Sequence, residues 1–281
     1  MKVVIKYPKE LEEKKKRIAK AGKDNLHVIS DFDRTITYGL NPQGTRTETV
    51  ISKLRSDSKY LGEDYAKKAH ELFDIYHPFE IAGDIPMEEK KVKMHEWWKK
   101  HFELIVECGL TKEIIEQVVK EKPLRFRKEA LDFIKTLDSN GIPLVFLSAA
   151  PGDMLVAYLE KNNLFQESVH VISNRYEFDE NGKTVKILEP IIHVFNKGET
   201  SLREYSLYKE QLKNRKNILL MGDTLGDADM AEGSDSNDII KIGFLNEKVE
   251  ENLEQFKDAF DVVILGDPGM DYINELLKEL I

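Results

Sequence analysis

The chain has 281 residues, of which 41% are hydrophobic and 33% are charged, a composition that supports a buried core and excludes a disordered chain. Its formal net charge of −9 argues against a surface that binds nucleic acid polymers or an anionic membrane. The single cysteine, Cys108, excludes an internal disulfide, and with no signal-peptide or membrane-spanning apolar run we expect a cytoplasmic protein.

The N-terminal region is expected to form a surface helix followed by a buried strand. Residues 9–22 combine many charged residues with good helix formers and end in Gly22, a favourable helix C-cap. The next apolar run, LHVIS at residues 26–30, is short and rich in β-branched residues, as in a buried strand. This strand leads directly into an acidic sequence that begins at Asp31.

The stretch from about 45 to 121 differs in character from the rest of the chain. It is dense in Glu and Lys, its apolar residues recur at helical spacing, and it contains no convincing strand pattern. Pro78, Gly83 and Pro86 interrupt it. We therefore predict an insertion over residues 45–121, made of several helices joined by short loops.

Beyond residue 122 strands and helices alternate. Short apolar runs predict strands at residues 143–147, 169–173, 217–221, 239–244 and 262–265. A helix is expected at 269–280, and Asn181-Gly182 is a signal for a two-residue hairpin turn. The alternation is typical of a parallel sheet with helices on both faces. The sequence thus predicts one α/β core, residues 1–44 and 122–281, with the helical insertion after its first strand.

Four polar clusters could carry chemistry, and three of them directly follow predicted strands. Ligands bind at the carboxyl ends of parallel strands, so clusters far apart in sequence can converge there. In the first, Asp31-Phe-Asp33-Arg-Thr35, one carboxylate can act as nucleophile and metal ligand and the other as general acid and base. Alone, this motif is equally compatible with a loop whose carboxylates cap the next helix.

The other three clusters suit a phosphate group and a metal ion. Ser148 follows a predicted strand and precedes a helix, a position that suits either a phosphate cradle or an ordinary N-cap. Lys197 could neutralise charge on a transferred phosphoryl group or be one of many surface lysines. Asp223 and Asp227, in GDTLGD, could face a magnesium ion or form a solvated acidic turn.

The order of the four clusters is more specific than any one of them, and it resembles the haloacid dehalogenase superfamily of phosphatases. Within that superfamily the chain looks like the cytosolic pyrimidine 5′-nucleotidase type III family over most of its length after about residue 26. The similar passages are DFDRTIT (31–37), FLSAAPGDML (146–155), IIHVFNKGE (191–199), LLMGDTLGDADMA (219–231) and KIGFLNEKVEE (241–251). The resemblance implies a Rossmann-like core with a helical cap, Mg²⁺ as cofactor, and nucleoside 5′-monophosphates, with UMP or CMP favoured, as substrates.

The resemblance also implies roles for the acidic residues. Asp31 would be the nucleophile that forms an aspartyl-phosphate, and Asp33 the general acid and base. Asp31, the backbone carbonyl of Asp33 and Asp223 would bind Mg²⁺. Asp227 and Thr35 would support this metal site from outside.

Substrate-binding residues follow from the same resemblance. Ser148, Ala149 and Lys197 would hold the phosphate, and Glu80 in the cap would contact the nucleobase or its ribose. His101 matches a position that in the family usually holds a small hydroxyl residue contributing to substrate binding, so this chain departs from the pattern there.

Two further features bear on the site and on its alternatives. Arg34 stands where an apolar residue is common in that family, which suggests a side chain outside the site. Trp97 and Trp98 are adjacent on a predicted helix and cannot share one face, so at most one of them meets a ligand. The same chemistry could act on phosphoserine, a sugar phosphate or a modified purine monophosphate, or transfer the phosphoryl group to another nucleoside. A catalytically inactive binding protein is the third alternative, and a monomer is expected.

Overall fold

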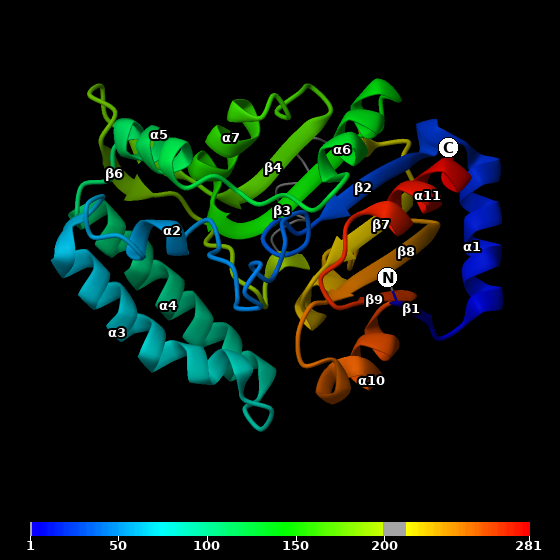
Figure 1. Ribbon diagram of the computed structural model, residues 1–281, viewed down its shortest axis with the longest axis horizontal. Coiled ribbons are helices and arrows are strands. Elements are labelled where there is room, and N and C mark those ends of the chain that lie inside the picture. Colours follow the sequence, from blue (N-terminus) through cyan, green and yellow to red (C-terminus); the bar gives the residue numbers. More distant parts are fainter. Residues whose placement is uncertain (1, 199–211) are drawn as a thin grey trace.

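The computed structural model describes residues 2–198 and 212–281, and it is built around a seven-stranded sheet in the order β1-β9-β8-β7-β2-β3-β4 (Figure 1). The strands are β1 (Lys2–Ile5), β2 (Leu26–Ser30), β3 (Leu144–Pro151), β4 (Val169–Asn174), β7 (Asn217–Gly222), β8 (Asp238–Leu245) and β9 (Val262–Leu265). All neighbours pair in parallel except β1, which pairs antiparallel with β9 at the edge. The predicted α/β fold with a mostly parallel sheet is therefore confirmed.

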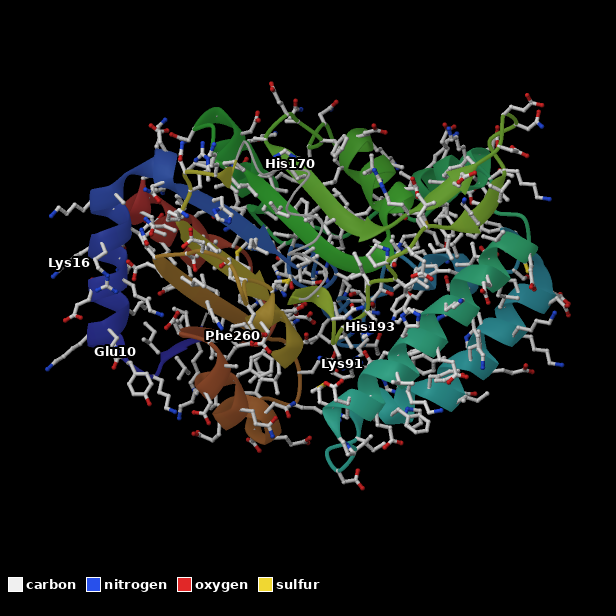
Figure 2. The ribbon with its side chains drawn as sticks, turned by 180° about the vertical axis from the view of Figure 1, so that it is seen from behind. Glu10, Lys16, Lys91, His170, His193 and Phe260 are labelled. Carbon is white, nitrogen blue, oxygen red and sulfur yellow. The ribbon has the colours of Figure 1, made fainter. Side chains whose placement is uncertain are left out.

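Helices cover both faces of this sheet. They are α1 (Pro8–Ala21), α6 (Ala130–Ser139), α7 (Gly152–Lys161), α10 (Val249–Ala259) and α11 (Asp271–Leu280), with short 3₁₀ turns at Lys23–Asn25 and Leu225–Asp229. Side chains of a strand alternate between the two faces, so Val28 packs toward α1, α6, α7 and α11 and Ile29 toward α10. Phe260, at the end of α10, lies against this second face (Figure 2).

The strand that the sequence analysis counts as the first is β2, because a four-residue edge strand, β1, precedes it. After β2 come the helices of the insertion: α2 (Ser52–Arg55), α3 (Gly62–Ile81), α4 (Met87–Glu107) and α5 (Lys112–Glu121). The prediction of helices without strands between 45 and 121 is confirmed. Pro78 does not end a helix, however: it lies inside α3, which continues to Ile81, so the break comes at Gly83 and Pro86 instead.

The insertion packs as a cap against one end of the core. Helices α3 and α4 lie side by side (Figure 1), and their buried cluster of Tyr76, Met94 and Trp97 contacts Val194 and Phe195 of the core. In Figure 2 Lys91 of α4 and His193 lie where the cap approaches the core. The cap therefore stands over the chain segment that leads to Lys197.

A small hairpin, β5 (Tyr176–Phe178) with β6 (Thr184–Ile187), reaches from the core to the cap. The backbone N–H of Thr184 donates to the carbonyl of Leu110, between α4 and α5. The predicted hairpin is confirmed, but the turn is longer than two residues: Asp179 pairs with Lys183, and Gly182 adopts a φ of 75°. None of the described helices is long and apolar enough to cross a membrane.

Candidate functional site

The centre of the site lies at the carboxyl end of β2, between β7 and β3. In the sheet, β2 has β3, the next core strand in the chain, on one side and the later strand β7 on the other. The strand order therefore changes direction at β2, and ligands of open α/β sheets bind at such a switch point. Asp31 follows β2 directly, and its backbone N–H donates to the carbonyl of Met221 at the end of β7. The predicted convergence of the clusters after β2 and β7 is thereby explained by the strand order.

A buried lysine joins the two acidic clusters. The Lys197 Nζ lies 2.5 Å from Asp31 Oδ1 and 2.7 Å from Asp227 Oδ1. The other oxygen of Asp31 accepts a hydrogen bond from Thr35 Oγ1 at 3.1 Å. Lys197 is therefore no surface lysine, since its side chain is only 6% exposed and serves as the counter-ion of two carboxylates.

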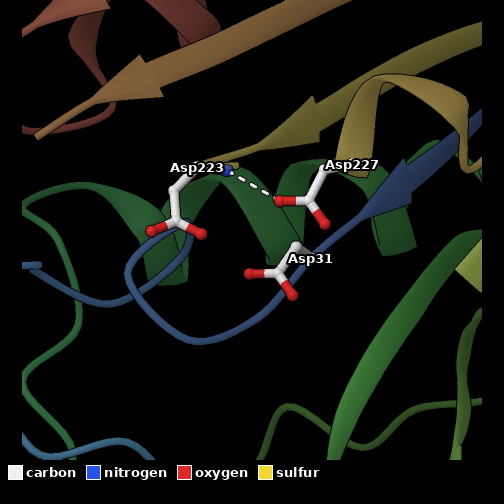
Figure 3. A group of neighbouring side chains, drawn as sticks. All are labelled: Asp31, Asp223 and Asp227. Carbon is white, nitrogen blue, oxygen red and sulfur yellow. Dashed lines mark hydrogen bonds between the residues drawn. The ribbon is translucent and has the colours of Figure 1, made fainter. Parts of the chain in front are cut away.

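The GDTLGD turn after β7 places Asp223 and Asp227 beside Asp31 (Figure 3). Asp227 Oδ2 accepts from the backbone N–H of Asp223 at 3.1 Å, and from the N–H and hydroxyl of Thr224 at 2.9 and 2.8 Å. A Cβ on Gly222 would stand 2.1 Å from the Cβ of Asp227, so only glycine allows this turn to close. Asp227 thus fixes the loop that presents Asp223.

The pKa values of these carboxyl groups report a concentration of negative charge. Burial raises the pKa of Asp31 to about 6, with Lys197 opposing the shift and Asp227 adding to it. Burial, followed by the charges of Asp31 and Asp227, raises the pKa of Asp223 well above its usual range. Burial by itself lowers the pKa of Lys197, but Asp227 and Asp31 outweigh it and the net direction is upward.

These residues fit a divalent cation. One carboxylate oxygen from each of Asp31, Asp223 and Asp227 lies within 4.8 Å of the others. Hard oxygen ligands of this kind suit Mg²⁺, and the raised pKa values of Asp31 and Asp223 mark a place where further positive charge would be stabilising. Asp227 accepts four hydrogen bonds, from Lys197, Asp223 and Thr224, and Asp31 accepts two, from Lys197 and Thr35, so Asp31 has more free oxygen valences for a metal ion than Asp227.

Asp33 is held toward the cap. Both of its carboxylate oxygens accept from the backbone N–H of Val50, at 3.0 and 3.1 Å, in the segment that leads into α2. Burial and the neighbouring charge of Asp31 raise the pKa of Asp33 to about 7. A carboxyl group with such a pKa exchanges its proton readily near neutral pH, as a general acid and base must.

Ser148 and Ala149 lie at the end of β3, the other neighbour of β2. Ser148 is 2% exposed, and its Oγ accepts from the backbone N–H of Ala150 at 3.2 Å. Asn174, which the sequence analysis does not single out, ties this loop to the next: its Nδ2 donates to the carbonyls of Ala149 and Ile192 at 2.7 and 2.9 Å. An asparagine at a strand end is the only sequence signal for it.

The structure does not bring the two cap residues, Glu80 and His101, into this buried cluster. Glu80 is in the last turn of α3, where burial raises its pKa and the charges of Arg34, Arg46 and Lys90 oppose the shift. Of these cations only Arg34 precedes the insertion, since Arg46 lies within residues 45–121 and Lys90 lies in α4. His101 is 3% exposed inside the cap, with its Nε2 3.1 Å from Tyr65 Oη and its ring stacked on Trp98.

The burial of His101 predicts a loss of stability in acid. Burial lowers its pKa to about 3, so between pH 6.5 and 3 the unfolded chain binds the proton and the folded one does not. Between pH 7 and pH 5 the free energy of unfolding should fall by roughly 2 kcal/mol more in the wild type than in His101→Gln. Urea titrations at the two pH values measure this, and parallel losses would contradict it.

Arg127, a fully buried arginine that the sequence analysis misses, holds the loop after Asp33. Its guanidinium donates to the carbonyls of Thr35 and Arg34 at 2.8 and 2.7 Å, and to Asn246 Oδ1 at 2.8 Å. It also pairs with Asp267 at 2.8 Å. No sequence motif marks a buried arginine that donates to backbone carbonyls, because every residue has such an acceptor.

Replacement of Arg127 should therefore destabilise the whole core. We expect Arg127→Ala to lower the free energy of unfolding by about 3–5 kcal/mol, since it leaves Asp267 buried without its cation. Arg125→Ala, an exposed arginine on the same segment, is the matched control and should cost about 1 kcal/mol or less. Denaturant unfolding compares the two, and equal losses would show that Arg127 is not the anchor.

The departure of Arg34 from the family pattern suggests a side chain outside the site, but the structure places it at the site's edge. With Asp223, Arg46 and Asn246 it lines a pocket of about 100 Å³. Its charge also opposes the raised pKa of Asp33, Asp223 and Glu80. Its guanidinium is thus among the groups around the mouth of the site.

Comparison with known proteins identifies the family. The family model of pyrimidine 5′-nucleotidase (UMPH-1) matches residues 34–281. The 7-methylguanosine phosphate-specific 5′-nucleotidase A of Xenopus laevis is 39% identical over 277 residues, 98% of this chain and 94% of that protein. The human 7-methylguanosine phosphate-specific 5′-nucleotidase is 35% identical over 281 residues, 99% of this chain and 92% of that protein.

Solved structures agree with the sequence comparison. A crystal structure of cytosolic 5′-nucleotidase IIIB bound to cytidine superimposes with a TM-score of 0.91 at 32% identity, covering 99% of this chain and 93% of that one. A substrate-bound phosphoserine phosphatase shares the fold, with a TM-score of 0.54 at 17% identity over 90% of this chain and 97% of that one. The chain belongs to the pyrimidine 5′-nucleotidase (UMPH-1) family and is a 5′-nucleotidase, a phosphoric monoester hydrolase.

Proposed function

We propose that this enzyme is a magnesium-dependent nucleotidase that acts through an aspartyl-phosphate on Asp31. The observation that carries the proposal is the buried group of Asp31, Lys197, Asp227 and Asp223 at the carboxyl end of the sheet. A nucleophilic carboxylate, a fixed cation and a set of metal-binding oxygens are the parts that phosphoryl transfer requires. Mg²⁺, bound by Asp31, the Asp33 carbonyl and Asp223, would neutralise charge on the phosphoryl group.

The reaction follows in two steps. Asp31 Oδ attacks phosphorus while the bond to the 5′-oxygen breaks, and Asp33 gives that oxygen its proton. Asp33 then removes a proton from a water molecule that attacks the aspartyl-phosphate, which returns Asp31 and releases phosphate. Lys197 balances the charge of the transferred group, and Ser148 and the backbone at Ala149 orient its oxygens. Thr35 and Asp227 hold Asp31 and the Asp223 turn in place.

For the substrate we propose 7-methylguanosine 5′-monophosphate together with CMP. Relatives of this chain are named for 7-methylguanosine phosphate, and a similar structure holds cytidine. An aromatic cluster in the cap, Phe73, Tyr76, Phe79, Trp97 and Trp98, adjoins the core at Phe195. Such rings suit a flat base, above all a methylated purine that carries positive charge.

Glu80 supports the same assignment. It lies in the last turn of α3, one residue after Phe79 of the aromatic cluster, and its carboxylate could accept hydrogen bonds from the amino and imino groups of a base. For His101 we propose an indirect part, in which its ring supports Trp98 from within the cap. We take residues 45–121 as the cap and 1–44 with 122–281 as the core, in a cytoplasmic, monomeric enzyme.

Phosphate release from a substrate panel tests the proposal. The panel holds 7-methylguanosine 5′-monophosphate, CMP, UMP, AMP, phosphoserine and ribose 5-phosphate, each with magnesium and with EDTA. We expect release from the first two, its loss in EDTA, and full recovery when excess magnesium is restored. Release from phosphoserine or ribose 5-phosphate alone would overturn the base site, and activity that survives EDTA would overturn the metal site.

A further inference from the structure

The backbone of Arg34 has a conformation that arginine rarely adopts. Its φ is 64°, in the left-handed region, directly after Asp33. Three contacts hold it there: its carbonyl accepts from Arg127 Nη2 at 2.7 Å and from Asn246 Nδ2 at 3.0 Å, and its N–H donates to Thr37 Oγ1 at 2.8 Å. A strained residue held by its surroundings beside a catalytic group is a reason to ask what its side chain does.

The guanidinium of Arg34 has hydrogen-bond donors to spare. Its Nε is buried and has no hydrogen-bond partner in the described part of the chain. Its Nη2 reaches the carbonyl of Thr47 at 3.4 Å, a long and weak contact. A buried N–H without an acceptor is costly, and an oxygen atom of a bound molecule would relieve that cost.

Arg34 also lies between the two ends of the proposed substrate site. It lines a pocket with Asp223 at the catalytic end, and its charge acts on Glu80 at the cap end. If a nucleotide binds with its phosphate at Asp31 and its base at Glu80, its ribose lies between these two ends. Because the negative charges of Asp33, Asp223 and Glu80 already act on the guanidinium, a neutral oxygen acceptor suits it better than another anion.

We propose that Arg34 binds the ribose hydroxyl groups of the nucleotide and so determines the preference for ribonucleotides. This inference rests on the proposed function, since it takes the phosphate and the base as placed above. In this role Arg34 binds the sugar, whereas the loss of its charge, which also acts on Asp33 and Asp223, would affect every substrate alike. Its removal should therefore raise KM for a ribonucleotide more than KM for a substrate that lacks the ribose hydroxyl groups.

Arg34→Met is the variant of choice, because Met has a similar length and bears the same backbone strain. We expect KM for CMP to rise about 10-fold more than KM for either of two substrates that lack the ribose hydroxyl groups, the effect of one hydrogen bond to a charged group. These two substrates are 2′,3′-dideoxy-CMP and p-nitrophenyl phosphate, on which the variant reports only the effect of the lost charge on the catalytic groups. Arg17→Met, a surface arginine paired with Asp238 on the far helix α1, should behave as the wild type.

The outcomes separate this inference from the proposed function. If the wild type releases no phosphate from CMP, the substrate assignment fails. If it does, but Arg34→Met loses equally on all three compounds or on none, the ribose role is overturned. Arg34→Asn, which tolerates a left-handed backbone and cannot reach the pocket, should show the same selective loss and decides the matter if the Met variant does not fold.

Discussion

Asp31→Asn is expected to abolish turnover, lowering kcat for nucleoside monophosphates by about 10⁴-fold or more, because it removes the proposed nucleophile. The amide keeps the shape of the carboxylate, but its neutral oxygen is too weak a nucleophile to form the acyl phosphate. Folding should be preserved. Asp31 is one of three crowded acidic groups, and its removal leaves Lys197 paired with Asp227 at 2.7 Å.

Two measurements check this prediction. The first is steady-state phosphate release, with Asp235→Asn as the matched control, since the Asp235 side chain is 95% exposed and lies on the surface. The second is acid quenching of the enzyme mixed with ³²P-labelled substrate, which should leave label on the wild type and none on Asp31→Asn. Activity above about one-tenth of the wild type in the folded variant would place the nucleophile elsewhere.

The strands that could be predicted from the sequence are those buried on both faces of the sheet, because they appear as continuous apolar runs. LHVIS and NILLM are short apolar runs that precede acidic residues, and they form β2 and β7, which Asp31 and Asp223 follow. β1 could not be predicted, because it is a partly exposed edge strand of only four residues. Pro78 misleads for a different reason: packing of α3 against α4 keeps the helix intact past the missing N–H.

The site likewise has a part that could be predicted from the sequence and a part that could not. The motif order and the resemblance supply Asp31, Lys197, Asp223 and Asp227, and the structure brings these four together. The motifs cannot show which contacts hold the loops in place, because the hydrogen-bond acceptors in those contacts are backbone carbonyls. Arg127 holds two of them in the Asp33 loop, and no residue pattern marks such a contact. The left-handed turn at Arg34 is hidden for a related reason, since it depends on donors that come from Arg127 and Asn246.

Lys197→Met should impair both stability and catalysis. In the metal-free enzyme the variant leaves Asp31 and Asp227 buried without their cation, which costs about 3–5 kcal/mol of unfolding free energy. Turnover should fall by about 10³-fold, because a fixed charge near the transferring phosphoryl group is lost. Lys53→Met is the stability control: it removes another buried lysine, but one whose nearest carboxylate, in Glu48, is 3.9 Å away.

The stability deficit of Lys197→Met should depend on pH in a defined direction. Lys197 lowers the pKa of Asp31, which burial raises to about 6, so its loss moves that pKa further up. A carboxyl group whose folded pKa lies above its unfolded value favours the folded state at low pH and disfavours it as pH rises through the folded pKa. With EDTA present, the variant should therefore be closer to the wild type at pH 5 than at pH 8.

Magnesium provides the last test of the same cluster. If the carboxylates of Asp31 and Asp223 bind the ion, magnesium should raise the melting temperature of Lys197→Met more than that of the wild type, because the variant has more uncompensated charge to neutralise. Thermal unfolding at pH 8, with EDTA and then with excess magnesium, measures both shifts. Equal shifts in the two proteins would mean that the ion binds away from the charge that Lys197 balances, and the metal site would have to be sought elsewhere.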